Sequence, residues 1–345
     1  MTPATLDAYL NTFTASNDPV KGQIAEVIRA FAAAAVLVRK SINEGALGAA
    51  FADSRGNANA GGDTQKELDV HADNLFLDGA RKASIGYYAS EELANPVTIN
   101  PDSDIAVAID PLDGSSNIDT NVSIGTIFSI LPRREDAATT FSQPGSEQLA
   151  AGFFIYGPQM ALVLTKRNGT RIYVFSSRLG TFVEAYPALT IPAMATEFAI
   201  NMSNYRHWDE TTRLYIDDCL AGTEGPREKD FNMRWIASLV ADTYRILIRG
   251  GVFLYPRDSR KGYAQGRLRL IYEASPIALL VEQAGGMATD GVTRILDLVP
   301  GDVHQRTPLV FGSKKEVDKI ARYHSDPSAI GTRHPLFAKR GLFRA

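Results

Sequence analysis

The sequence has little cysteine, no signal-like start and no long apolar run. Its 345 residues include a single cysteine, Cys219, so no disulfide bond forms within the chain. There is no positively charged start followed by an apolar run, as a secretory signal requires. The longest apolar stretch, residues 31–38, falls far short of the ~20 residues of a membrane-spanning helix. These absences predict a cytoplasmic protein that does not span a membrane.

Charge of one sign is also scarce. The formal net charge is −3, and the chain has no block of like charges and no basic stretch with interleaved aromatic residues. Nucleic acid or a membrane surface is therefore not expected as a partner, and a small polar ligand fits better. The histidines form no HExxH pattern for zinc, and no Gly-x-Ser-x-Gly elbow presents a serine nucleophile.

The apolar residues are patterned for both helices and strands, and a hydrophobic content of 45% is ample for a large core. Steps of three and four between apolar positions predict amphipathic helices over residues 22–42, 64–82, 206–220 and 233–249. Short continuous apolar runs predict strands at 105–109, 123–131, 152–155, 160–165 and 172–175. Because several strands follow one another without a helix, we expect a largely antiparallel or mixed sheet.

Turn-forming residues divide the chain further. Residues 53–63 are rich in Gly, Asn and Ala without any period, which predicts a mobile surface loop. A Pro-containing stretch near residue 190 marks a domain boundary. We expect domains at 1–190 and 191–335, followed by a tail at 336–345. Ser275 is the expected N-cap of a helix that begins with a proline and closes at a pair of glycines.

One predicted strand runs directly into a segment with the chemistry of a metal and phosphate site. Asp110 and Asp113 lie three residues apart on a rigid Pro-Leu turn, so both carboxylates can reach one cation. Gly114 allows close approach of the backbone to a ligand. Ser115 and Ser116 then offer amide and hydroxyl donors at an expected helix start, where a phosphate is stabilised. The alternative is an ordinary Asp/Gly/Ser turn that caps a helix.

Other acidic residues favour the metal hypothesis, because phosphoryl transfer needs several oxygen ligands and usually more than one Mg²⁺ ion. Glu91 and Glu92 close a short strand-like run, although adjacent glutamates also occur on solvated helix faces. Asp63 and Asp69 flank the end of the Gly-rich loop, which is able to close over a bound metal and phosphate. Glu273 precedes a helix start, where it either points to a metal or acts as a simple cap.

Several longer motifs occur in order along most of the chain. They are Asn59-x-x-Gly62-Asp63-x-x-Lys66-x-Leu68-Asp69-Val70, Ser90-Glu91-Glu92, Asp110-Pro111-Leu112-Asp113-Gly114-Ser115-Ser116-Asn117-Ile118-Asp119, Ser123-Ile124-Gly125-Thr126-Ile127-Phe128, Gly250-Gly251-Val252-Phe253-Leu254-Tyr255-Pro256, Leu268-Arg269-Leu270-Ile271-Tyr272-Glu273 and Asp302-Val303-His304-Gln305-Arg306. This series resembles class I fructose-1,6-bisphosphatase, within the lithium-sensitive, magnesium-dependent sugar-phosphate phosphatases.

The resemblance implies a fold, an activity and an assembly. The fold is a layered αβαβα sandwich of the α/β (α+β) class with two domains. The activity is hydrolysis of fructose 1,6-bisphosphate to fructose 6-phosphate, in gluconeogenesis or the Calvin cycle. It uses two or three Mg²⁺ ions, for which Mn²⁺ is a candidate substitute. The assembly is a homotetramer or dimer in which Arg234 reaches across a subunit interface into the neighbour's site. The rivals are a dual fructose/sedoheptulose bisphosphatase and a catalytically silent sugar-phosphate-binding protein.

The resemblance also assigns roles to individual residues. The implied metal ligands are Glu91, Glu92, Asp110, the carbonyl of Leu112, Asp113 and Glu273. The residues implied to act on the attacking water are Asp69 and Glu92, with Asp63 in the loop that engages the third ion. The residues implied to bind substrate near the 1-phosphate are Asp113, Gly114, Ser115 and Ser116. Those implied at the 6-phosphate end are Asn201, Arg234, Trp235, Tyr255 and Arg267.

Some positions depart from the family pattern. Trp235 stands where a tyrosine is usual, and Arg267 replaces a lysine, so phosphate binding is kept while the pocket size changes. The AMP site of vertebrate members depends on a Lys-Tyr pair that is Asp104-Ile105 here, and on an arginine that is Pro132. A Thr-Gly-Glu-Leu run is also absent near Lys21. We therefore expect that AMP does not inhibit this protein at physiological concentration.

Overall fold

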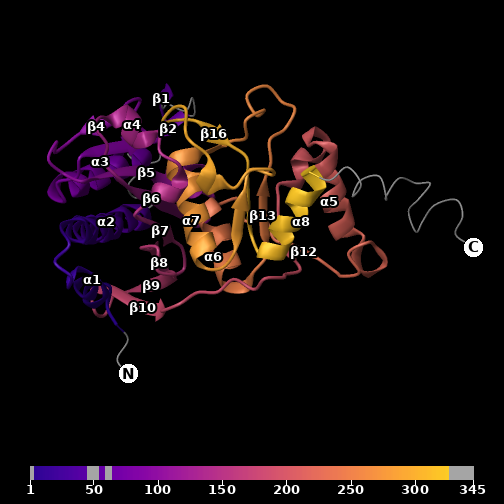
Figure 1. The fold of residues 1–345 in the computed structure, drawn as a ribbon, viewed down its shortest axis with the longest axis horizontal. Helices are drawn as coiled ribbons and strands as arrows, with labels where there is room; N and C mark the ends of the chain where they lie inside the picture. Colours follow the sequence, from indigo (N-terminus) through magenta and orange to yellow (C-terminus); the bar gives the residue numbers. More distant parts are fainter. Residues whose placement is uncertain (1–3, 45–53, 59–63, 326–345) are drawn as a thin grey trace, which may run out of the picture.

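Helices and sheets alternate in five layers across the molecule (Figure 1). The computed structural model describes residues 4–44, 54–58 and 64–325. Three helices form the first layer, a large sheet the second, two helices the third, a smaller sheet the fourth and two helices the fifth. This arrangement confirms the predicted layered αβαβα sandwich of the α/β class.

The large sheet has eight strands in the order β10-β9-β8-β7-β6-β5-β3-β4. Their bounds are β3 (Tyr87–Ser90), β4 (Val97–Thr98), β5 (Ile105–Asp113), β6 (Ile124–Pro132), β7 (Ala150–Tyr156), β8 (Met160–Thr165), β9 (Thr170–Ser176) and β10 (Thr181–Tyr186). Every neighbouring pair is antiparallel except β3 and β5, which are parallel with Ser90 opposite Ile109. The predicted mixed, largely antiparallel sheet is confirmed, and β10 was not predicted.

Both faces of this sheet are buried, which explains the continuous apolar runs. Helices α1 (Leu6–Thr14), α2 (Pro19–Glu44) and α3 (Glu67–Lys82) cover one face. Along β7, Phe154 packs into that core, while its neighbour Phe153 points to the opposite face and packs with the middle helices. Alternate residues of a strand point to opposite faces, so a strand between two helical layers is apolar at every position.

The small sheet has five strands in the order β12-β11-β13-β17-β15. Their bounds are β11 (Glu197–Ala199), β12 (Asn232–Met233), β13 (Val252–Tyr255), β15 (Met287–Thr289) and β17 (Leu309–Gly312). Helices α6 (Leu239–Arg249) and α7 (Ser275–Gln283) lie between the two sheets, and α5 (Glu210–Leu220) and α8 (Lys314–Ser325) cover the outer face (Figure 1). Among the remaining short elements are α4 (Ala137–Phe141), β1 (Ser54–Ala58), β2 (Thr64–Lys66), β14 (Leu268–Arg269) and β16 (Arg306–Thr307).

The predicted loop over 53–63 is wrong in its described part. Residues 54–58 form β1, which pairs antiparallel with β2, and α3 therefore begins at Glu67 instead of residue 64. Pairing between two short strands supplies partners for the backbone without any period in the side chains, so the side-chain pattern does not show it. Asp63, the rest of that loop and the expected tail at 336–345 lie outside the described residues.

Three predicted helix starts are also wrong. The helix predicted at 233 begins at Leu239, because Ala237 adopts φ 66° and Ser238 caps the amide of Ala241. The helix predicted at 206 begins at Glu210, after the N-cap Asp209. Ser275 is not an N-cap, because a π-helical turn over Leu270–Ala274 already leads into α7. Within the described ranges, no helix is long and apolar enough to span a bilayer.

Candidate active site

Three buried carboxylates meet where the large sheet faces the middle helices. Asp110 and Asp113 come from the end of β5, and Glu273 comes from the π-helical turn before α7. One oxygen from each lies within 4.8 Å of the other two. Backbone amides fix their orientations, since Leu112 N–H donates to Asp110 at 3.0 Å, Val240 N–H to Asp113 at 3.1 Å and Arg269 N–H to Glu273 at 2.5 Å. The structure thus brings together three of the predicted ligands.

The electrostatics of this cluster favour a cation. Burial raises the pKa of Asp113 to about 7, and the pKa of Asp110 and of Glu273 lies well above its ordinary value for the same reason. The negative charge of neighbouring Glu91 raises all three further. Burial and like charge disfavour the ionised form, and a bound divalent cation removes both penalties. A buried, all-oxygen donor set fits a hard cation such as Mg²⁺.

The two glutamates follow directly on the neighbouring strand. Glu91 N–H donates to the carbonyl of Ile109 at 3.1 Å, which continues the parallel register of β3 and β5 and places Glu91 beside Asp110. A guanidinium nitrogen of buried Arg269 lies 3.4 Å from a Glu91 oxygen. Glu92 also contributes to the raised pKa of Asp110. The predicted grouping of these glutamates with the strand-end aspartates is therefore present.

Helix α3 is tied to the same corner of the site. Asp73 accepts a hydrogen bond of 2.8 Å from the Tyr88 hydroxyl of β3, and Ser90 accepts one of 3.2 Å from the amide of Glu92. Asp69 is buried on the same helix, one turn before Asp73. Its side chain therefore comes from an element packed directly on the strand that carries the glutamates.

The segment after Asp113 turns sharply. Gly114 adopts φ 78°, a left-handed conformation that favours glycine, and a 3₁₀ helix over Ser115–Thr120 follows. Ser115 is half-buried and Ser116 is exposed, so their donors are accessible at the start of this short helix. Leu112, whose carbonyl is an implied ligand, is buried between the two aspartates.

The residues expected at the distal phosphate come from four separate segments. Trp235 stacks on Phe253 with ring centroids 5.6 Å apart. Its ring centroid lies 5.9 Å from that of Tyr255, with the two ring planes at 63°. The pKa of Tyr255 is raised by burial, lowered by the nearby Arg267 charge and raised again by Glu273. Tyr255 thus lies within electrostatic reach of both Arg267 and the carboxylate cluster.

The two other predicted substrate residues have different surroundings. Arg234 is exposed, and its Nε lies 4.0 Å from Glu197. Asn201 caps the following 3₁₀ helix (Met202–His207), where its side chain accepts from the amide and the hydroxyl of Ser203 at 3.2 and 2.6 Å. Arg234 has room to turn toward a ligand, whereas Asn201 already has a structural role.

One segment joins the two ends of the site. Residues 234–240 carry Arg234 and Trp235 at one end, and at the other the amide of Val240 contacts Asp113. Between them, the Asn117 side chain donates to the carbonyl of Ala237 at 2.8 Å. The turn at residues 113–117 and the residues expected at the distal phosphate are therefore linked by direct contacts.

Sequence reasoning missed several residues of this region. Arg269 is one of them, and its signal in the sequence is a basic residue inside an apolar run. Asp73 lies four residues after Asp69, the spacing of one helical face. Glu197 gives no sequence signal, because it approaches Arg245 only through the packing of α6 on the small sheet. Asp242 and Arg245 lie three residues apart on α6 itself, which is a spacing that brings side chains together on one helical face.

The chain is similar to known proteins over its whole length. The family profile "Fructose-1-6-bisphosphatase, N-terminal domain" matches residues 7–187, and the corresponding C-terminal domain profile matches residues 191–325. "Fructose-1,6-bisphosphatase class 1" of Rhizobium meliloti (strain 1021) is 64% identical over 100% of both chains. The protein of the same name from Azorhizobium caulinodans is 54% identical over 94% of this chain and 100% of that one. The holo form of Leishmania major fructose-1,6-bisphosphatase is 32% identical with a TM-score of 0.86, covering 94% of this chain and 100% of that one.

Proposed function

The chain belongs to the fructose-1,6-bisphosphatase family, and from this we propose that it hydrolyses fructose 1,6-bisphosphate to fructose 6-phosphate and phosphate. The observation that carries this proposal is the buried cluster of Asp110, Asp113 and Glu273 beside a left-handed glycine turn. A metal site next to accessible amide and hydroxyl donors suits a phosphate ester. A cytoplasmic location remains part of the proposal.

We assign the metal ligands to Glu91, Glu92, Asp110, the carbonyl of Leu112, Asp113 and Glu273. When bound, two or three Mg²⁺ ions neutralise phosphate charge and lower the pKa of a coordinated water, and Mn²⁺ is a candidate substitute. The backbone donors to Asp110, Asp113 and Glu273 hold these oxygens in place without the ion, so little reorganisation accompanies its binding.

The remaining assignments concern the proton and the phosphates. Asp69 and Glu92 would accept the proton of the attacking water, and Asp63 would belong to the loop beside them. The 1-phosphate would rest on Gly114, Ser115 and Ser116. The distal phosphate would be bound by donors and charges at Asn201, Arg234, Trp235, Tyr255 and Arg267.

Domain division and assembly are proposed on the same grounds. A division into 1–190 and 191–335 is supported by the family profiles, which meet between residues 187 and 191. Self-association as a homotetramer or dimer is supported by the exposed Arg234, which lies between the exposed apolar residues Met233 and Ile236. Sedimentation of the purified chain measures this directly.

The decisive assay is phosphate release from a panel of sugar bisphosphates, with and without Mg²⁺ and lithium. We expect Mg²⁺-dependent release from fructose 1,6-bisphosphate and inhibition by lithium. Comparable kcat/KM for sedoheptulose 1,7-bisphosphate would identify a dual enzyme. Release from none of the sugars, with binding retained, would replace the hydrolase proposal with that of a sugar-phosphate-binding protein.

A further inference from the structure

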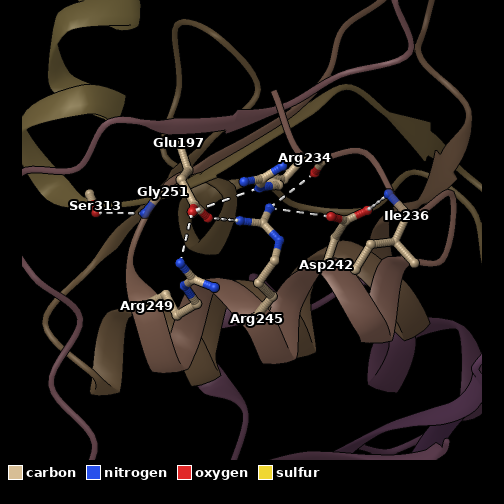
Figure 2. Close-up of polar contacts among 8 residues, drawn as sticks. All are labelled: Glu197, Arg234, Ile236, Asp242, Arg245, Arg249, Gly251 and Ser313. Carbon is tan, nitrogen blue, oxygen red and sulfur yellow. Dashed lines mark hydrogen bonds and ion pairs between the residues drawn. The ribbon is translucent and has the colours of Figure 1, made fainter. Parts of the chain in front are cut away.

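Two side chains of α6 hold the backbone on both sides of Trp235 (Figure 2). Arg245 Nη2 donates to the carbonyl of Arg234 at 3.2 Å. Asp242 Oδ2 accepts from the amide of Ile236 at 3.1 Å. The peptides before and after the indole are therefore each bonded to the same helix.

The two side chains are themselves fixed by ion pairs. Arg245 Nη1 lies 2.7 Å from Glu197 Oε2 on β11, and its Nη2 lies 3.3 Å from Asp242 Oδ1. The side chains of Arg245 and Glu197 are each 13% exposed, and that of Asp242 is fully buried. Charges this far from water are strongly held in place, because removing one partner leaves the other unpaired in a poorly solvated site.

The segment that they hold is also fixed at other points, among them the hydrogen bond from the Asn117 side chain to the carbonyl of Ala237. Trp235 is half-buried and stacks on Phe253 with one face. The amide of Arg234 donates to the carbonyl of Phe198 at 2.8 Å, and two residues after Trp235 Ala237 adopts φ 66°. A non-glycine residue in this conformation costs free energy, so the surrounding contacts must maintain the segment's shape.

We propose that Arg245, braced by Glu197 and Asp242, is a positioning residue for the distal-phosphate end of the site. Its guanidinium engages carboxylates and a backbone carbonyl, and its effect on substrate passes through Arg234 and Trp235. The kinetic consequence of this inference rests on the proposed function. The two hydrogen bonds from Arg245 and Asp242 to the backbone beside Trp235, which we call the clamp, also have a consequence in the ligand-free protein. That consequence is the restricted access of solvent to the Trp235 ring.

The test uses Trp208→Phe as the parent, which leaves Trp235 as the single tryptophan. In this parent we expect Arg245→Gln to raise the KM for fructose 1,6-bisphosphate about tenfold, with kcat changed by less than about twofold. In the ligand-free protein the same change should raise the constant for acrylamide quenching of Trp235 fluorescence.

Arg249→Gln is the matched control. Arg249 also pairs with Glu197, at 3.3 Å, but its side chain is 64% exposed. The contact drawn for it in Figure 2 is with that carboxylate and not with the segment around Trp235. We expect parental KM and parental quenching for this variant. Arg245→Lys and Asp242→Asn give the same tests with smaller changes if Arg245→Gln does not fold, as judged by its circular dichroism.

The outcomes separate the alternatives. Parental quenching in folded Arg245 and Asp242 variants overturns the proposal, as does a lowered melting temperature with unchanged KM and quenching. An equal effect of Arg249→Gln also overturns it. The positive charge beside Glu197 would then be what matters, and the contact of Arg245 with the backbone of Arg234 would not. If the parent fails to hydrolyse the bisphosphate, the proposed function fails, while the quenching measurement still decides the clamp.

Discussion

At the scale of the residue, the buried carboxylate cluster affects both the proposed metal binding and the stability of the folded protein. Asp110, Asp113 and Glu273 are buried together, and each accepts a backbone hydrogen bond that orients it without removing the mutual repulsion. Hydrogen bonds to a carboxylate favour its charged form, whereas burial and like charge oppose it. Here burial prevails, since the pKa of all three is raised. A bound cation would stabilise the ionised form of these three carboxylates.

Asp113→Asn should abolish most Mg²⁺-dependent phosphate release, by more than about 100-fold, because changes even to outer contacts of metal sites cost 10–100-fold. The amide oxygen of Asn still accepts from Val240 N–H, so the fold should persist. Asp318→Asn on α8, where the side chain is 46% exposed, is the matched control and should be active. Unchanged release by Asp113→Asn would refute the metal assignment.

The same cluster predicts a pH-dependent effect of Mg²⁺ on stability. Burial raises the pKa of Asp113 to about 7 in the folded protein, above its unfolded value of about 4. The folded state then binds more protons, so this group's contribution is full below about pH 4 and is lost as the pH rises through about 7.

Differential scanning fluorimetry of the metal-free protein checks this sign. The Mg²⁺ concentration is held fixed at about 100 times the Kd measured at about pH 8. It should raise Tm by roughly 5 °C at that pH, and by less at about pH 5, where the carboxylates hold protons and bind the ion more weakly. Asp113→Asn should reduce the rise at the higher pH. An equal Mg²⁺ effect at both pH values would contradict the raised pKa.

At the scale of the element, close packing between strands and helices positions the site. Gly125 of β6 lies where a Cβ would come 2.3 Å from the carbonyl oxygen of Phe154 and 2.7 Å from the side chain of Val240 in α6. Val240 is also the residue whose amide contacts Asp113. The absence of a side chain at Gly125 thus allows the start of α6 to pack closely on the large sheet.

Gly125→Ala should therefore lower the free energy of unfolding by about 1–3 kcal/mol through overpacking. Gly22→Ala is the matched control, because its Cβ would meet nothing within 4 Å and the position lies inside α2. That change should stabilise by about 0.5–1 kcal/mol. Urea denaturation measures both, and equal effects of the two substitutions would contradict this account.

The paired ends of β5 and β6 carry the prediction on AMP. Ile105 lies opposite Pro132, and the amide of Asp104 donates to Gln23 of α2 at 3.2 Å. The residues that replace the implied nucleotide contacts therefore lie side by side, with a negative charge where a lysine is usual. We expect no inhibition by AMP in a dose–response assay, and strong inhibition at micromolar AMP would contradict this prediction.

At the scale of the whole molecule, the middle helices make the layers interdependent. One core contains Ile127 and Phe153 from the large sheet, Leu247 from α6, Leu280 from α7 and Phe253 from the small sheet. Loss of either sheet would expose the apolar faces of both helices. The division of the chain into two family profiles therefore does not imply two independent folding units.

We expect calorimetry to show a single unfolding transition, with equal calorimetric and van't Hoff enthalpies per cooperative unit. The measurement is best made at saturating Mg²⁺, so that loss of the ion does not split the transition. Two resolved transitions, one for each half, would show that the shared core contributes little.

Much of the site was predictable from the chain, because its chemistry is local. Asp110, Asp113 and Gly114 adjoin one apolar strand, and the glutamates end a second. Other features were not predictable. The pairing of β1 with β2, the late start of α6 and the π-helical turn before α7 all depend on backbone contacts that the side-chain pattern does not report.

Periodicity and residue chemistry are written locally along the chain, so the sequence by itself determined the main helices and strands, the grouping of acidic residues at strand ends and the family resemblance. The layered arrangement was implied by that resemblance. Only the tertiary structure decided which carboxylates share one buried cluster, and that Arg245 and Asp242 hold the segment around Trp235. The reason is physical. Burial, pKa and ion pairing depend on groups brought together from distant segments, which no spacing in the sequence specifies.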